Sequence, residues 1–414
     1  MRRRRLLAYS AAAVGFAGCL EGGGEDTAPT FTEVESIGPT QNTTERARES
    51  TVTPRIGGSL NGRPFRLEDD IELLQQSETT WLHAFLDVRE KYEQDVTPRE
   101  DPDVVALRRA IQEVGTKLVV SLQWDFMGLF GDKGPTNLPP AGSAHESALI
   151  EYATELLAAV DEDVDIVVLG NEPVWETLDE DFVGRNTPLI HFTRTLKEHL
   201  VQHYATGDTQ FLLGAFNRLY GNYVSKKYHR FYSQLFEMAR NDDDIAGIDL
   251  HVHYEAFGQA ERMLAVARKA FPAGVVTVTE FSPMWRYAQK KNEPITSFEG
   301  GERFADRYGI ASSTTVTEYF EAAKDDRLSA TEAADFMDAM PWYNVDFVED
   351  MYDLMDRYDV TVGTFGFLVE RGIRNVDWTE EWAPFAINCL FQPGLIETDN
   401  GAHPHYIDDY RVRA

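Results

Sequence analysis

The stretch DIVVLGNEP, which runs from Asp165 to Pro173, is a short apolar run followed by a glycine, an amide, a carboxyl group and a proline. A run of Ile, Val and Leu of this length is typical of a strand buried on both faces of a parallel sheet. Seven more apolar runs resemble it. The eight predicted strands are Arg55–Ser59, Thr80–Leu86, Lys117–Gln123, Asp165–Gly170, Gln210–Ala215, Gly247–His253, Val275–Thr279 and Thr361–Phe367.

Amphipathic segments with apolar residues at helical spacing lie between these runs. The clearest are Val104–Val114, Ser147–Val160, Thr187–Leu200 and Val345–Tyr358. Eight strands, each followed by a helix, predict a closed (β/α)8 TIM barrel formed by residues 54–414. The main alternative is a doubly wound open sheet. That fold usually has a glycine-rich phosphate-binding turn after its first strand, and Gly57-Gly58 opens no such fingerprint.

One connection is much longer than the others. About 80 residues separate the seventh and eighth predicted strands, and residues 284–344 form the bulk of this insertion, with Gly300-Gly301 and two short predicted helices. An insertion at this place on a barrel lies at the rim that carries catalytic residues. It is therefore a candidate lid or wall of a binding site.

The N-terminus predicts export. Arg2 to Arg5 precede the apolar run Leu6–Ala17, which is too short to span a bilayer, so residues 1–18 are interpreted as an export signal of the twin-arginine type. Cys19 ends a stretch similar to a lipobox, in which the cysteine becomes lipid-modified. Residues 19–53 are polar and predict a flexible tether. An uncleaved apolar N-terminus without a function is the alternative.

The chain has a net charge of −30 and 29 Arg against 10 Lys. Such an acidic surface argues against nucleic acid or an anionic membrane as partners, so membrane attachment is expected through the lipid alone. Acidic, lysine-poor composition also favours a high-salt organism, with an ordinary soluble acidic protein as the alternative. The order of anchor, tether and globular body predicts a cell-surface or extracellular location. No disulfide is expected if Cys19 carries lipid, because Cys389 is the only other cysteine.

Two predicted strands end in a carboxylate. Glu172 follows the fourth strand and Glu280 closes the seventh, and these strands face each other across a barrel mouth. Glycosidic cleavage with retention needs two such groups, an acid/base and a nucleophile, roughly 5–5.5 Å apart. We expect the charge of Glu280 to raise the pKa of Glu172 and so to keep the acid protonated.

Asn171-Glu172-Pro173 and Glu280 resemble the clan of retaining glycoside hydrolases that includes the cellulase family 5. The resemblance implies that Glu172 is the acid/base, that Glu280 is the nucleophile and that Asn171 binds a sugar 2-hydroxyl. The run from Ile248 to Tyr254 is similar to the clan's His-x-Tyr signature. Where family 5 has Arg, His and Trp on strands two, three and eight, this chain has the residues around His83, Gln123 and Phe365.

The resemblance implies a carbohydrate substrate, no cofactor and no metal, and a monomer is expected. Besides the two catalytic carboxylates, the predicted substrate contacts are Asn171, His83, Trp124, His251, His253, Tyr254, Trp285 and Phe365. Trp378 is a further candidate platform for a sugar. Asp125, Glu176 and Glu255 are predicted rim residues that could replace a misassigned catalytic group.

Several alternatives stay open. Glu172 could simply begin a helix, and Glu280 could pair with Arg286. His251 and His253 could be a core pair, or could bind a metal together with Asp249, which would give a metal-dependent hydrolase. The changes at His83 and Gln123 also allow a catalytically inactive lipoprotein that binds carbohydrate on the same barrel.

Overall fold

The computed structural model describes residues 55–60, 64, 67, 71–129, 134–161, 164–182, 187–204, 208–219, 226–368, 389–397 and 400–413. The predicted export signal, the tether, lipidation of Cys19 and the role of Trp378 all concern residues outside these ranges. Within the described residues, no helix is long and apolar enough to cross a membrane.

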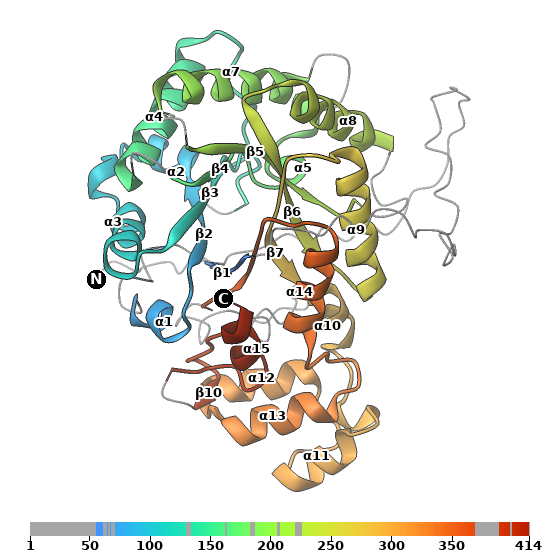
Figure 1. Cartoon of the computed structure of the whole chain (residues 1–414). Helices are drawn as coiled ribbons and strands as arrows, with labels where there is room; N and C mark the ends of the chain where they lie inside the picture. Colours follow the sequence, from blue (N-terminus) through green and yellow to red (C-terminus); the bar gives the residue numbers. More distant parts are fainter. Residues whose placement is uncertain are drawn as a thin grey trace.

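Eight parallel strands close into a barrel in the order β1-β2-β3-β4-β5-β6-β7-β9 (Figure 1), which confirms the predicted (β/α)8 fold. The strands are β1 Arg55–Ser59, β2 Trp81–Asp87, β3 Lys117–Gln123, β4 Ile166–Val168, β5 Gln210–Asn217, β6 Ile245–His253, β7 Val275–Ser282 and β9 Val362–Gly366. Each predicted strand overlaps one of them. The order follows the chain, and β1 pairs with β9 to close the ring.

Helices surround the barrel (Figure 1). Before the insertion they are α1 Ile71–Gln76, α2 Val88–Glu93, α3 Pro102–Arg109, α4 Ala144–Val160, α5 Pro173–Glu176, α6 Asp179–Phe182, α7 Pro188–His203, α8 Lys226–Asn241 and α9 Phe257–Ala270. The predicted helix Val104–Val114 corresponds to most of α3 and the π-helical turn that follows it, η3 Ala110–Val114. Gly115 ends this turn in a left-handed conformation. Asp101 caps α3 by accepting bonds from the backbone N–H groups of Asp103 and Val104.

The insertion is richer in helix than predicted. It contains α10 Met284–Lys290, η5 Ile295–Ser297, α11 Gly301–Tyr308, α12 Val316–Asp325, β8 Leu328–Ser329 and α13 Ala330–Ala339. The prediction of two short helices was therefore wrong. It did not take into account the local signals that start helices in this segment. Thr315 and Glu318 form a capping box that starts α12, and Ser329 caps α13. Rings of Phe304, Tyr319 and Phe336 pack together between these helices.

The insertion joins the C-terminal part of the chain. Strand β8 pairs in parallel with β10 Ile396–Glu397, which lies near α13 and α15 Tyr406–Arg413 (Figure 1). The last barrel strand is preceded by α14 Phe347–Arg357, so the helix predicted over Val345–Tyr358 is confirmed.

Polarity changes along the barrel interior. At the amino ends of the strands, an apolar layer contains Trp81, Val119, Ile166, Val168, Leu212 and Val362. Two residues further along β2, β3 and β9, on the same face, lie His83, Ser121 and Thr364, all fully buried. The interior thus becomes polar toward the carboxyl ends, where catalytic groups of barrel enzymes lie.

Candidate active site

Glu172 lies just beyond β4, in a backbone conformation that few residues adopt. Its φ of 38° and ψ of 59° are left-handed, and Pro173 starts α5 directly after it. Asp125 after β3 and Arg218 after β5 also have positive φ, 41° and 49°. Left-handed conformations of residues other than glycine cost of order 1–3 kcal/mol and gather at functional sites. The carboxyl ends of three neighbouring strands share this feature.

Glu280 is aimed by a β-bulge. Leu250 of β6 pairs with Val278 of β7, but the next residue, His251, pairs with Glu280, so Thr279 is an extra residue on β7. A bulge redirects the side chains that follow it. Here it places Glu280 beside His251 on the inner face of the barrel.

Buried Asp249 holds this bulge. Its carboxylate accepts hydrogen bonds from the Thr277 hydroxyl at 2.5 Å, and from the hydroxyl and backbone N–H of Thr279 at 2.6 and 3.2 Å. Burial raises the pKa of Asp249 to about 6, although His251 and the threonine bonds lower it. Asp249 thus faces the threonines. The suggestion that it binds a metal with the two histidines is wrong.

His251 lies between the two carboxylates. Its Nδ1 is 3.1 Å from Glu172 Oε1 and 3.5 Å from Glu280 Oε2. These two distances together limit the separation of the two carboxylate oxygens to 6.6 Å. Asn217, at the end of β5, donates a second hydrogen bond to Glu172 Oε1 at 2.9 Å. Glu172 and Glu280 therefore face one another in one site, and Glu280 pairs with histidine rather than with Arg286.

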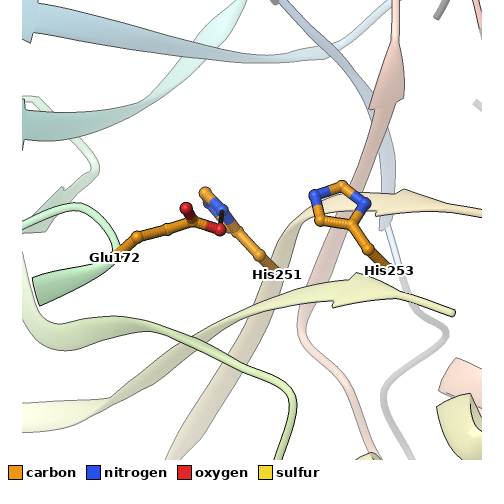
Figure 2. Close-up of side chains that lie close together, drawn as sticks. All are labelled: Glu172, His251 and His253. Atoms are coloured by element: carbon orange, nitrogen blue, oxygen red, sulfur yellow. Dashed lines mark hydrogen bonds and ion pairs between the residues drawn. The ribbon is translucent and has the colours of Figure 1, made fainter. Parts of the chain in front are cut away.

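His253 completes the group. Its Nε2 lies 3.2 Å from Glu280 Oε2, and its Nδ1 lies 2.8 Å from the hydroxyl of Ser282. Figure 2 shows Glu172 reaching toward the two histidines of β6. One ligand atom each from Glu172, His251 and His253 lies within 4.8 Å of the other two. The histidines are thus part of the carboxylate site.

The charges within this group give Glu172 a different protonation state from the one expected. Burial raises the pKa of Glu172, but the hydrogen bond and charge of His251 outweigh burial and the charge of Glu280, so this pKa lies below its ordinary value. The expected raised pKa of Glu172 is therefore wrong, because His251 lies between the two carboxylates. Burial also raises the pKa of Glu280, yet the two histidines bring it down to about 2.

His251 carries the proton instead. Burial lowers its pKa, but the charge of Glu280 and the hydrogen bond and charge of Glu172 raise this pKa to about 9. At neutral pH the group thus consists of two ionised carboxylates and a protonated imidazole between them.

Asn171 and Glu176 form a second polar group behind Glu172. Glu176 accepts hydrogen bonds from Asn171 Nδ2 at 2.7 Å, Gln123 Nε2 at 3.0 Å and the backbone N–H of Trp124 at 3.1 Å. Burial raises the pKa of Glu176 to about 8 despite these bonds. Among the described residues, no group forms a hydrogen bond with Asn171 Oδ1, and Asn171 lines a small cavity with Glu176 and Trp124. Glu176 is buried, so it fixes Asn171 instead of lying on the rim.

Three predicted substrate contacts are core residues. Trp124 packs edge-on against Phe192, Tyr254 packs against Phe257 and Phe347, and Phe365 packs against Phe281 and Tyr406. All three predicted residues are at most 4% exposed. None of them can present a ring face to a sugar, and these predictions are wrong because their apolar rings are covered by neighbouring aromatic side chains.

His83 lies one layer below the carboxylates. It is fully buried and its two ring nitrogens lie 2.9 Å from the hydroxyls of Ser59 and Ser121. Burial lowers its pKa to about 3. His83 therefore supports the floor of the site and makes no direct substrate contact.

Trp285 lies in α10, directly after β7, and its contact with a sugar stays a prediction. The Arg218 guanidinium lies over its ring, 4.4 Å from the centroid, and 5.5 Å from that of Trp175, a side chain that is 37% exposed. Asp125 holds the turn after β3 by accepting a bond from the Leu129 N–H at 2.6 Å, and Glu255 is exposed at the end of β6. Trp175 and Trp285 thus lie in α5 and α10, the helices that follow Glu172 and Glu280 along the chain.

Four residues of the site were not predicted from the sequence: Asn217, Ser282, Arg218 and Trp175. Asn217 and Ser282 carry no motif, but both lie at the extreme end of an apolar strand. That position is the signal that could have identified them, because polar residues there point toward the mouth of a barrel.

No protein-family profile and no curated protein matches the chain. Among solved structures, a β-mannanase from Thermomonospora fusca is similar at 10% identity, over 85% of this chain and 92% of that one, with a TM-score of 0.40. A family 30 subfamily 8 xylanase from Clostridium acetobutylicum has 11% identity and a TM-score of 0.33, over 55% of each chain. An aldose reductase from Giardia lamblia has 11% identity and a TM-score of 0.31, over 62% of this chain and 75% of that one. Likenesses at these identities and TM-scores do not assign a function to the chain.

Proposed function

We propose that the protein is a retaining glycoside hydrolase that cleaves a β-linked glycan, with Glu280 as nucleophile and Glu172 as acid/base. One observation carries this proposal. An oxygen of each carboxylate contacts the same nitrogen of His251, so these oxygens are at most 6.6 Å apart. Retaining enzymes hold their carboxyl groups about 5–5.5 Å apart, whereas inverting enzymes leave roughly 6.5–9.5 Å for a water molecule.

The charge state of the site indicates which residue performs each step of the reaction. Glu280 is ionised over the whole physiological range, as attack on an anomeric carbon requires. His251 Nδ1–H donates to Glu172 Oε1, so its proton can pass to Glu172, which delivers it to the leaving oxygen as the glycosyl–Glu280 bond forms. Glu172, now ionised, then takes a proton from water while that water releases the sugar from Glu280. Asn217 keeps the Glu172 carboxylate in place through both steps.

A panel of aryl β-glycosides in multimolar salt tests the proposal with Glu172→Gln and Glu280→Gln. Both variants keep the size of the side chain and lose its acid–base or nucleophilic chemistry. We expect losses of about 10²–10⁴-fold for Glu172→Gln with poor leaving groups and smaller losses with activated ones, because good leaving groups need no acid. Glu280→Gln should lose turnover for all substrates, and azide should restore it in Glu280→Gly.

Turnover that survives both substitutions would contradict the proposal. Sugar binding without turnover in the wild-type protein would instead support the inactive carbohydrate-binding protein. The matched control is Glu255→Gln, which changes an exposed carboxylate at the end of β6. Its activity should equal that of the wild-type protein.

We also propose that the enzyme acts at the cell surface as a lipid-anchored protein. The pattern from Arg2 to Cys19 supports export and lipidation.

A further inference from the structure

We propose that Glu172, Glu280, His251 and His253 form a binding site for a divalent transition metal such as Zn²⁺. Binding of this metal would compete with the two-carboxylate reaction. The site itself does not depend on the proposed function, but the competition does, because a metal-bound Glu280 cannot attack a sugar.

The distances within the group match a tetrahedral metal site. Zn–N and Zn–O bonds of about 2.0–2.1 Å place neighbouring ligand atoms about 3.3–3.4 Å apart in a tetrahedron. His251 Nδ1 lies 3.1 Å from Glu172 Oε1 and 3.5 Å from Glu280 Oε2, and His253 Nε2 lies 3.2 Å from Glu280 Oε2. Three of the six edges are thus close to the required length. One ligand atom each of Glu172, His251 and His253 lies within 4.8 Å of the other two. Glu280 contacts both histidines, and side-chain rotations that bring its carboxylate toward that of Glu172 would complete the four ligands.

The chemistry of the ligands fits the ion. Two imidazoles and two carboxylates are ordinary zinc ligands once His251 Nδ1 has released its proton to water, and the two carboxylates then balance the charge of a divalent cation. The side chains come from β6, β7 and the turn after β4 and are only 2–24% exposed, so the barrel holds them in place. Buried, preset ligands pay little ordering entropy when a metal binds.

Ser282 can serve both states of His253. A serine hydroxyl donates or accepts a hydrogen bond. While His253 Nε2–H donates to Glu280, the Ser282 hydroxyl can donate to Nδ1 at 2.8 Å. If Nε2 binds a metal, Nδ1 carries the hydrogen and donates to Ser282. Such a partner for the second ring nitrogen is typical of metal-binding histidines.

The experiment measures Zn²⁺ binding to the EDTA-treated full chain by titration calorimetry, with Co²⁺ absorption spectra as a report of tetrahedral geometry. His253→Asn removes one ligand. We expect one tight site in the wild-type protein and at least a tenfold weaker affinity in His253→Asn, with loss of the visible Co²⁺ bands. Circular dichroism and thermal unfolding establish that the variant is folded.

His203→Asn is the matched control. His199 and His203 lie one turn apart on α7 with ring centroids 4.4 Å apart, and such a histidine pair can also attract Zn²⁺ at a protein surface. The Zn²⁺ affinity and Co²⁺ spectrum of His203→Asn should equal those of the wild-type protein. Absence of binding to the wild-type protein would overturn the proposal. So would binding that His203→Asn removes and His253→Asn leaves intact.

Turnover of the EDTA-treated protein separates this inference from the proposed function. Activity without metal that Zn²⁺ inhibits and EDTA restores supports both. Activity without metal, together with no Zn²⁺ binding, overturns the metal site alone. Zn²⁺ binding at His253 with activity only in the presence of the metal supports the metal site and contradicts the two-carboxylate mechanism.

Discussion

At the scale of single residues, His251 determines the charge of the site. It lies between Glu172 and Glu280, and the mutual interactions lower the pKa of both carboxyls while they raise that of the imidazole. The sequence placed the carboxylates and both histidines at strand ends, but it could not place His251 between the carboxylates. The position of His251 between them depends on the bulge at Thr279, and no local sequence pattern predicts this bulge.

The pH dependence of kcat/KM should report this arrangement. Because the working proton resides on His251, whose pKa is raised to about 9, activity should fall as the pH rises through about 9. Protonation of Glu280 should reduce activity only near pH 2, since its pKa is lowered to that value. In His251→Asn the proton must reside on Glu172 alone. The fall in kcat/KM on the basic side of the pH profile should therefore move to lower pH.

The pH profiles of wild-type protein and His251→Asn on one aryl glycoside check this prediction. His253→Asn serves for comparison, because it removes the other imidazole but leaves the proton of His251 in place. An identical basic limb in wild-type protein and His251→Asn would show that His251 does not hold the proton.

At the scale of elements, the positions of the strands could be predicted from the sequence, but the residues at which several of them end could not. Arg55–Ser59 and Lys117–Gln123 were predicted with their observed bounds because each apolar run stops at a polar residue or turn. Strand β5 continues to Asn217 and β7 to Ser282, since pairing in the closed sheet extends both beyond their apolar runs. Aromatic residues after strands were misassigned for a related reason. Trp124 and Tyr254 are covered by helices that only the folded barrel brings near.

The bulge in β7 yields a test with a matched control. Thr277→Val and Thr279→Val each remove one hydroxyl that donates to the Asp249 carboxylate. Each should lower the free energy of unfolding by about 1–3 kcal/mol, because a buried carboxylate oxygen loses a partner. Only Thr279 lies in the bulge, so only Thr279→Val should displace Glu280.

Denaturant unfolding and steady-state kinetics on both variants measure the two effects. A displacement of about 1 Å costs roughly 10²-fold in rate, so kcat should fall by about 10- to 100-fold in Thr279→Val and stay near the wild-type value in Thr277→Val. Equal kcat values in the two variants would mean that the bulge does not position Glu280.

At the scale of the whole molecule, charge is the dominant property. The net charge of −30 destabilises the folded state through self-repulsion. Salt shortens the Debye length from about 10 Å at 0.1 M to about 3 Å at 1 M and so weakens this repulsion. The barrel itself follows from the strand pattern at this scale, whereas the helices of the insertion pack around their own aromatic residues.

The melting temperature should therefore rise steadily as KCl increases from the millimolar to the multimolar range. Differential scanning calorimetry measures it, with sucrose as a non-ionic control that stabilises by exclusion but does not screen charge. The rise in KCl should exceed that in sucrose of equal osmolality. A melting temperature that is independent of KCl would contradict this account.

The central claim is that Glu280 attacks the sugar, and a trapped intermediate tests it most directly. The protein is incubated with activated 2-deoxy-2-fluoro-β-glycosides, chosen from the sugars that the aryl glycoside panel shows to be turned over, and peptides are mapped by mass spectrometry. The structure predicts one covalent glycosyl adduct on the peptide that contains Glu280, and none in Glu280→Gln. An adduct on another residue, or turnover of the parent glycosides by Glu280→Gln, would contradict the assignment.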